Sequence, residues 1–228
     1  MTSNALSDLG GRLDEVRVLS KLDPARTGDT SQPATSNAIN RGCIVLLCSH
    51  LEGFLEDLAI ESLDALASFQ APVAQLPLIL RALHVEDHLK ELEPIKDRKA
   101  RAPRIEKMFA DEGGFWTFGS QISTTMLRPK TVCSQMSNPG SKEVRQFLDL
   151  LGVDIEGHLR ETGSLSLLHR INGLVGNRNS IAHGERGVNP TSGDVDTYLT
   201  LVEDLSREID SALANAVKGI CSLAQLPW

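Results

Sequence analysis

The chain of 228 residues carries a net charge of -7 at neutral pH, and 41% of its residues are hydrophobic but only 4% are aromatic. A chain of this length holds one sizeable core, so we expect a single domain over residues 1–228. Leu, Ala and Ile dominate the apolar set, which favours packed helices over sheets and predicts an all-α fold. The acidic balance excludes a protein that coats nucleic acid through a uniformly basic surface, so any RNA contact must be local.

The four cysteines form no C-x-x-C pair, and Cys43 and Cys48 lie inside an apolar helical run. This pattern is typical of reduced core thiols in a cytosolic protein rather than of disulfides or a metal cage. No apolar run reaches membrane-spanning length, and the N-terminus lacks the basic flank and apolar segment of a signal peptide. We therefore expect a cytoplasmic protein with no membrane partner, no cofactor and no bound metal.

Apolar residues at helical spacing predict a first helix over Leu6–Leu22, which ends at Asp23-Pro24. Residues 23–37 are rich in Ser, Thr, Gly and Pro and are predicted to form a loop or linker. The apolar spacing resumes at Ile39 and continues to about Ala67, which predicts a long core helix.

Residues 71–163 are expected to form a helical insertion. The predicted helix Leu78–Leu92 carries His84 and His88 one turn apart, a spacing that can chelate a metal. The metalloprotease motif requires a glutamate directly after the first histidine, and Val85 stands there instead. We therefore favour two surface histidines over a zinc site.

The segment Lys96–Lys107 holds six basic residues against two acidic ones in a chain that is acidic overall. Such a segment is usually a solvated face, but its local field also suits a phosphate backbone. The aromatic group that follows is more often core packing at a helix end than a base-stacking platform. The candidate RNA-binding residues are Arg98, Lys99, Arg101 and Arg104, and the aromatic group is Phe109, Phe115, Trp116 and Phe118.

After a polar loop over Thr131–Ser141, the pattern predicts a short helix over Ser141–Leu151 and a connector over Val153–Gly163. The next helix, Ser164–His183, starts at a reasonable N-cap. A turn-rich loop leads to the last helix, which opens at Thr191–Asp194 and repeats its apolar residues at spacings of three and four. The short loop makes these two helices antiparallel partners.

The helix Ser164–His183 carries polar side chains at positions where a purely structural helix would carry leucine. Arg178 interrupts an apolar stripe on one face, and a guanidinium is seldom buried unless it is paired or meets an anion. The apolar stripe consists of Leu168, Ile171, Val175, Arg178 and Ala182, and a polar stripe beside it consists of His169, Asn172, Gly176, Asn179 and His183.

Arg178 and His183 lie about 140° apart around the helix axis, so one helix cannot aim both side chains at one phosphate. Either the helix frays at Gly184 and lets His183 swing round, or a second chain brings its own helix alongside. In a two-fold dimer the apolar stripe becomes an interface, Gly176 permits close approach, and both copies of the pair converge on one cleft. The second route accounts for the position of Arg178.

Such a pair suits cleavage of RNA without a metal. His183 would act as general base on the ribose 2′-hydroxyl or as acid on the leaving oxygen, because imidazole titrates near neutral pH. Arg178 would hold the phosphate and stabilise charge in the transition state. Asn179 would orient His183 by a hydrogen bond, and the product would carry a 2′,3′-cyclic phosphate.

The segment Arg178–Gly184 resembles the R-x4-6-H motif of HEPN ribonucleases, in which a polar residue often follows the arginine. The core helix with Leu51–Leu58, the motif helix and the long last helix are similar in layout to the RiboL-PSP and MAE-like HEPN group. The resemblance covers about Ile39–Ala67 and Ser164–Ile220 and leaves the middle of the chain uncovered.

The resemblance implies an all-α HEPN bundle, a homodimer with a composite active site, and metal-independent endoribonuclease activity. It also implies a toxin or effector of a toxin–antitoxin or anti-phage defence system, with an antitoxin or defence protein as partner. By the motif, Arg178 and His183 are catalytic and Asn179 is supporting. HEPN toxins that are inactivated by nucleotidyl transfer carry a tyrosine two residues after the histidine, whereas this chain has Glu185.

Three alternatives stay open. The first is that Arg178 pairs with Glu52 or Glu56 inside the bundle and that His183 merely caps its helix. These two carboxylates lie on the polar side of the long core helix, where a solvated face is the ordinary interpretation and a supporting role, to orient or neutralise Arg178, is the less common one. The second alternative is a HEPN-like module that binds nucleotide or RNA, or scaffolds a partner, without cleaving. The third is a metal-dependent hydrolase that uses the histidine pair of the Leu78–Leu92 helix.

Overall fold

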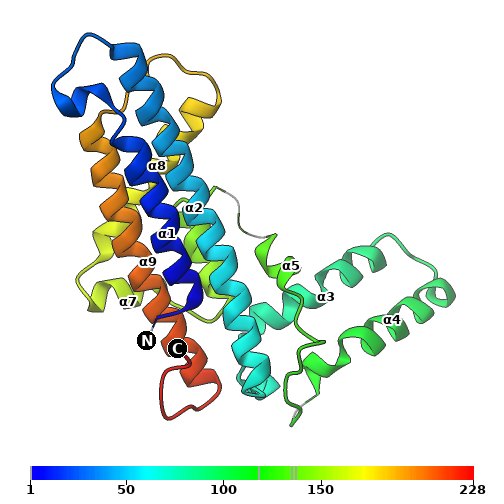
Figure 1. Ribbon diagram of the computed structural model, residues 1–228. Helices are drawn as coiled ribbons and strands as arrows, with labels where there is room; N and C mark the ends of the chain where they lie inside the picture. The colour runs from blue at the N-terminus through cyan, green and yellow to red at the C-terminus, as the bar shows by residue number, and fades with distance from the viewer. Residues whose placement is uncertain (1, 118, 135, 137) are drawn as a thin grey trace. The chain divides into compact units, whose positions relative to one another are not determined.

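The computed structural model describes residues 2–117, 119–134, 136 and 138–228, which form nine α-helices and no β-strand (Figure 1). The predicted all-α fold is confirmed. The helices are α1 Asn4–Ser20, α2 Pro33–Ser68, α3 Leu78–Leu92, α4 Arg98–Glu112, α5 Pro129–Cys133, α6 Ser141–Leu150, α7 Ile155–Glu161, α8 Leu165–Ala182 and α9 Ser192–Ile220, with short 3-10 turns at Pro24–Thr27, Val73–Gln75 and Gly113–Trp116.

The described chain divides into two compact units, and α2, α6 and α9 contribute residues to both. The first unit contains α1, α7 and α8, and the second contains α3, α4 and α5. The first unit is Met1–Leu58, Met136–Gln146 and Asp154–Ala212, and the second is Ala59–Gln135, Phe147–Val153 and Leu213–Trp228.

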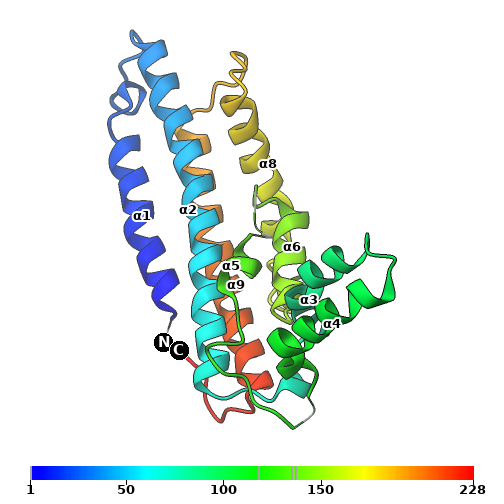
Figure 2. The ribbon, with the colours of Figure 1, turned by 90° about the vertical axis from the view of Figure 1, so that its right-hand side faces the viewer.

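In the first unit α1 and α8 pack with the segments of α2 and α9 that belong to it (Figures 1 and 2). An ion pair between Arg12 and Asp57 at 2.5 Å joins α1 to α2, and the Asn177 amide donates to the Tyr198 hydroxyl at 3.1 Å, which joins α8 to α9. The Ser164 hydroxyl, just before α8, donates to Glu208 at 3.1 Å. The start of α8 thus lies by a later part of α9 and its end by an earlier part, which confirms the predicted antiparallel pairing. Fully buried side chains of this unit include Leu9, Leu13, Ile44, Leu47, Leu51, Phe54, Leu168, Ile171, Leu174, Val202 and Ile209.

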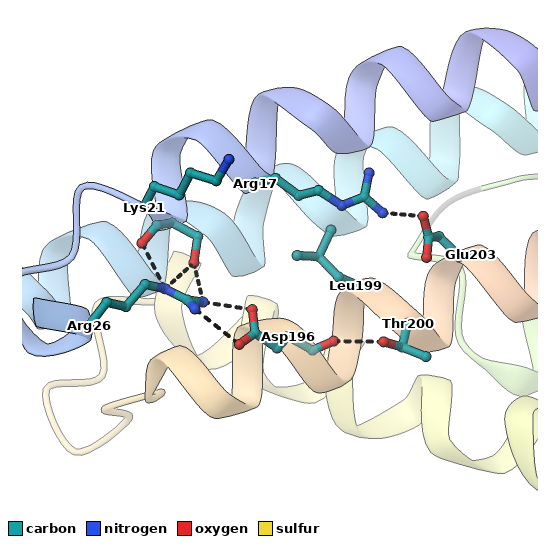
Figure 3. Close-up of a pocket in the computed structure, with 8 residues that line it drawn as sticks. Arg17, Lys21, Arg26, Asp196, Leu199, Thr200 and Glu203 are labelled. Carbon is teal, nitrogen blue, oxygen red and sulfur yellow. Dashed lines mark hydrogen bonds and ion pairs between the residues drawn. The ribbon is translucent and has the colours of Figure 1, made fainter.

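Two further ion pairs join α1 and the Pro24–Thr27 turn to α9 around a small cavity of about 250 Å³ (Figure 3). Arg17 pairs with Glu203, and Arg26 pairs with Asp196 at 2.6 Å while also donating to Ser20. Each of these arginines already has a carboxylate partner. The residues around the cavity therefore join the helices through ion pairs, and neither arginine is left unpaired to bind an anion.

The long core helix begins earlier than predicted. α2 starts at Pro33, inside the segment 23–37 that was expected to be a loop or linker, and the Pro24–Thr27 turn occupies another part of that segment. Proline suits the first turn of a helix, because the missing N–H has no intrahelical acceptor there. The predicted loop is therefore wrong from Pro33 onward, where α2 has already begun.

Asp23 anchors the start of α2 and is 1% exposed. Its carboxylate accepts from the Asn40 amide at 2.9 Å and from the Ala25 N–H at 2.9 Å. Burial raises the pKa of this carboxyl, but the hydrogen bonds from Ser36, Asn40 and Ala25 outweigh burial, so the pKa lies below its ordinary value.

Replacing Asp23 by Ala should lower the free energy of unfolding at pH 7 by about 3 kcal/mol, since charged hydrogen bonds are lost and Asn40 keeps an unpaired buried amide. A carboxyl with a lowered folded pKa stabilises above its unfolded pKa, and that contribution disappears as the pH falls through the folded value. The difference between variant and wild type should therefore shrink below about pH 4. Urea unfolding at pH 7 and pH 3 measures it, and an undiminished difference at pH 3 would contradict the proposed role of the charge.

The last helix, α9, starts within the predicted opening Thr191–Asp194, and a reciprocal capping structure forms there. The Thr191 hydroxyl accepts from the Asp194 N–H at 3.2 Å, and the Asp194 carboxylate accepts from the Thr191 N–H at 2.8 Å. These bonds satisfy orphan donors at the helix start. The backbone bond from Thr191 is the main reason that the pKa of Asp194 is lowered.

In the second unit α3 and α4 form a helical hairpin, and α3 has the predicted bounds Leu78–Leu92. The buried Glu112 at the end of α4 accepts from Arg128 at 2.6 Å. Burial raises the pKa of Glu112, and the charges of Arg128 and His88 oppose that shift.

His84 is a core residue, so the expectation of two surface histidines is wrong for it. Its Nδ1 lies 2.8 Å from the Leu80 carbonyl oxygen, and its Nε2 accepts from the Arg128 N–H at 3.1 Å. Both ring nitrogens are therefore engaged by the backbone, and neither is free to bind a metal. His88 lies beside Asp111 and Glu112, at 3.6 and 3.9 Å.

Two predicted irregular segments contain helices. α7 occupies most of the predicted connector Val153–Gly163, and α5 overlaps the start of the predicted loop Thr131–Ser141. Both helices are short, at 7 and 5 residues, and so carry too few apolar repeats for the spacing to be recognised. The predicted helix before Gly152 is α6, and Gly152 adopts a left-handed φ of 80° there.

Candidate functional site

The candidate site lies in the first unit, on the C-terminal half of α8. Ser164 and His183 are its flanking cap residues, as predicted, although the Ser164 hydroxyl donates to Glu208 instead of capping the helix. Along the apolar stripe, Leu168 and Ile171 are fully buried, Arg178 is half-buried and Ala182 is exposed. The helix thus emerges from the core just before its arginine.

Two asparagine oxygens hold the Arg178 guanidinium. Its Nη1 donates to Oδ1 of Asn138 and to Oδ1 of Asn179, each at 3.1 Å. Neutral oxygens position a guanidinium without cancelling its charge, and three of its five N–H bonds, the two on Nη2 and the one on Nε, are not used by these contacts. Asn179 therefore contacts Arg178 through its side chain, and meets His183 through its backbone carbonyl, which accepts from the His183 N–H.

Arg178 forms no ion pair with any carboxylate in the part of the chain that the structure describes. The pairing with Glu52 or Glu56 that would make Arg178 structural is therefore not present. The pKa of the buried Cys48 thiol is raised to about 12, mainly by burial. The charge of Arg178 lowers this pKa and the charge of Glu52 raises it, so both charges lie close enough to affect the same thiol. α8 and α2 therefore bring the two charges to the same neighbourhood without joining them.

The polar stripe also has a structural role, which sequence reasoning missed. The Asn172 amide oxygen accepts from the Ser141 N–H at 2.8 Å, and its Nδ2 donates to the Ser141 hydroxyl at 3.0 Å. This reciprocal pair caps the start of α6 and ties the adjoining turn, with Asn138 at a φ of 50°, to α8. The Asn-Pro-Gly sequence at 138–140 signals a turn, but nothing in it indicates that the turn reaches Arg178.

His183 is exposed and lies at the C-cap of α8, which ends in a Schellman motif. The Glu185 N–H donates to the Ser180 carbonyl and the Gly184 N–H donates to the Ile181 carbonyl, each at 3.0 Å, with Gly184 at a left-handed φ of 79°. The helix end is therefore hydrogen-bonded rather than frayed. The first of the two routes for bringing His183 round to Arg178 has no support from this geometry.

Arg41 of α2 fixes the loop that follows His183. Its Nη1 donates to the carbonyl oxygens of Glu185 and Val188, at 2.9 and 2.8 Å. A single guanidinium thus holds both ends of the turn at residues 185–188. Arg41 was not among the predicted site residues, because a cation on a helix far away in the sequence carries no signal for this contact.

Replacing Gly184 by Ala should lower the free energy of unfolding by about 1 kcal/mol, because an L residue is strained at a left-handed φ. Gly187 is the matched control: it lies three residues on, lacks a positive φ, and has open space where a Cβ would go. Its replacement by Ala should change the free energy of unfolding by less than about 0.5 kcal/mol. Equal losses in the two variants by denaturant unfolding would argue against the strained C-cap.

The remaining predicted residues lie elsewhere. The candidate RNA-binding residues Arg98, Lys99, Arg101 and Arg104 are all exposed on α4, in the second unit. In that unit Phe115 is a core residue, Phe109 and Trp116 are exposed, and Phe118 falls outside the described residues.

The described residues were compared with the requirements of a metal site and of a membrane-spanning helix. No cluster of three or more His, Cys, Asp or Glu side chains is arranged to hold a metal ion there. No disulfide joins the cysteines among the described residues; Cys43 and Cys48 are buried, as expected of core thiols, whereas Cys133 and Cys221 are only half-buried. Across the same residues, no helix combines the length and the apolar character that a membrane crossing requires.

The all-α bundle fits the HEPN superfamily: its motif helix ends with an arginine and a histidine five residues apart and packs antiparallel on a long last helix. The sequence matches the RiboL-PSP-HEPN family over residues 8–215, and the chain belongs to that family. The match also spans residues 71–163, which the motif resemblance left uncovered. Searches of the curated proteins and of the solved structures each gave no match. Membership suggests a nuclease or other RNA-related role.

Proposed function

We propose that the protein is a metal-independent endoribonuclease that acts as a toxin or effector in a toxin–antitoxin or anti-phage defence system. The proposal depends on the surroundings of Arg178. Its guanidinium has no carboxylate partner among the described residues and is held by the side chains of Asn138 and Asn179. Arg178 also lies on the helix that ends at the exposed His183. A structural arginine is usually satisfied by an anionic partner or by backbone carbonyl oxygens, as Arg41 is, whereas Arg178 contacts only two side-chain amides in the part of the chain that the structure describes. Arg178 has two positioning contacts and keeps its charge for a ligand.

The reaction uses the ribose 2′-hydroxyl as nucleophile. The neutral imidazole of His183 takes the 2′-hydroxyl proton as the 2′-oxygen bonds to phosphorus, and the bond from phosphorus to the 5′-oxygen breaks. The leaving oxygen takes a proton from an imidazolium, and the products are a 2′,3′-cyclic phosphate and a 5′-hydroxyl. Arg178 binds a non-bridging phosphate oxygen and stabilises the charge that develops there.

The site is composite, because the ordered end of α8 leaves Arg178 and His183 pointing in different directions. A two-fold dimer brings the partner's Arg178 and the partner's His183 to the same cleft, which supplies one imidazole as base and a second as acid. The sequence predicts the apolar stripe as the interface, but its Leu168 and Ile171 are buried in the core of their own chain. The second copy therefore faces the neighbouring polar stripe, with Gly176 at its centre. In this arrangement a monomer holds half of an active site.

The test is cleavage of a fluorescent single-stranded RNA in excess EDTA, with analysis of the product ends. Retained cleavage with 2′,3′-cyclic phosphate ends supports the proposal, and cleavage that requires added metal would contradict it. Binding without turnover would favour a HEPN-like module that recognises RNA without cutting it.

A further inference from the structure

Nearly all side chains of the helix α4, in the second unit, are exposed to solvent. It has 15 residues, and only Glu112 is buried. A helix of this length is marginal in water by itself, because helical stability comes mostly from tertiary packing. Its apolar side chains are also uncovered, with Ile105 37% and Phe109 59% exposed. This surface is therefore suited to a ligand that covers it.

An apolar groove runs between α3 and α4, with a volume of about 400 Å³. Apart from the carboxylate of Glu112, which pairs with Arg128, its walls are apolar or aromatic. The groove is large enough for a planar ring, and two of its walls are exposed aromatic side chains. Its lining residues are Val85, Leu89, Met108, Phe109, Glu112, Gly113 and Trp116.

Trp116 is held in place at the mouth of this groove. The Arg81 guanidinium lies over its ring, 5.3 Å from the ring centroid, and Arg81 also donates to the Phe115 carbonyl oxygen. The indole nevertheless remains 41% exposed. A cation fixed over an aromatic ring orients the ring and leaves the rest of its surface for stacking.

The cations of α4 are mostly uncompensated. Arg104 pairs with Glu91 at 3.2 Å, whereas Arg98, Lys99, Arg101 and Lys107 make no ion pair with the described residues. In the first unit, five of the ten arginines have a carboxylate partner. The helix that borders the exposed aromatic groove thus carries four cations without an ion pair to the described residues, in a chain that is acidic overall.

Helix geometry divides these cations into two sets. At 100° per residue, Arg101 projects within about 20° of Met108, and Arg98 within about 20° of Phe109, so both continue the face that lines the groove. Arg101 is roughly 10 Å along the axis from Met108, at 1.5 Å per residue. Lys99 projects about 180° from Met108, on the opposite face.

We propose that the groove between α3 and α4 is a binding site for single-stranded RNA. One base enters the groove and stacks against Trp116 and Phe109, and the phosphates that follow lie along Arg101 and Arg98. Aromatic surfaces beside a row of cations are how proteins hold single strands without reading their sequence. This inference rests on the proposed function, since it identifies the strand that the nuclease holds.

The experiment titrates the full chain with a 2′-O-methyl decauridylate, which cannot be cleaved because it lacks the 2′-hydroxyl. Trp116 is the reporter, and Trp116→Phe supplies the background from Trp228. We expect the RNA to quench Trp116 fluorescence. Phe109→Ala should weaken binding about tenfold or more, the effect of losing one stacking aromatic. The double variant Arg98→Glu, Arg101→Glu should lower the slope of log affinity against log salt by about 1.4, for two lost phosphate contacts.

Lys99→Glu is the matched control, because it reverses a charge of the same helix on the face away from the groove. Equal weakening by Lys99→Glu and by Arg101→Glu, or unquenched Trp116 at saturation, would overturn the site. Quenching by an acidic helical peptide but not by the RNA would assign the groove to a protein partner instead. Loss of groove binding with intact cleavage would leave the proposed function standing, and groove binding without cleavage would remove the function and keep the site.

Discussion

Replacing Arg178 or His183 by Ala should lower the rate of RNA cleavage in EDTA on the order of 10²- to 10⁴-fold. That range corresponds to the loss of a general acid–base group or of a charge that stabilises the transition state. His183 is exposed and Arg178 is half-buried, so neither change removes core packing. Circular dichroism and denaturant unfolding should therefore show a fold close to wild type, with the free energy of unfolding changed by less than about 1 kcal/mol.

The same helix offers a matched control in the exposed Arg170. Arg170→Ala removes a guanidinium from α8 outside the candidate site, and cleavage should stay within about twofold of wild type. Arg178→Lys keeps the charge and loses the planar fork, so its rate should lie between those of wild type and the alanine variant. Unchanged cleavage in both Arg178→Ala and His183→Ala would remove the catalytic assignment.

Replacing Gly176 by Arg should separate the proposed dimer and abolish most cleavage, by a factor comparable to the loss of a catalytic residue. Gly176 is exposed in the middle of the polar stripe, and a Cβ built on it meets nothing within 4 Å. The substitution therefore fits the single chain, and should even favour the helix by roughly 0.5–1 kcal/mol relative to glycine. Only a second copy close to this position would clash with the added side chain.

Gly10→Arg is the control for this prediction. Gly10 is also an exposed helical glycine, in α1, and its Cβ likewise meets nothing within 4 Å. Light scattering at micromolar concentration should show a dimer for wild type and for Gly10→Arg and a monomer for Gly176→Arg, with cleavage following the dimer. A fully active monomer would refute the composite site, and a wild-type protein that is monomeric throughout would do so without any variant.

Long elements of this fold could be predicted from the sequence, because each repeats its apolar residues over several turns. The spacing that begins at Leu78 predicts α3 with its observed bounds, and the predicted opening over Thr191–Asp194 contains the start of α9 at Ser192. Short helices such as α7 lack that repetition and were missed. The early start of α2 was missed because residues 33–38 are polar and small, although Pro33 is well placed in a first turn.

The sequence by itself determined the all-α class, the motif helix, and the mismatch between Arg178 and its apolar stripe. These are properties of spacing along one helix, and spacing is local. Only the tertiary structure decided that Arg178 has no carboxylate partner and is held by Asn138, which lies 40 residues away in the sequence. It also decided that Arg41 fixes the loop after His183 and that His84 is a core residue. Contacts of this kind depend on which helix faces pack together, and no local pattern in the sequence indicates that packing.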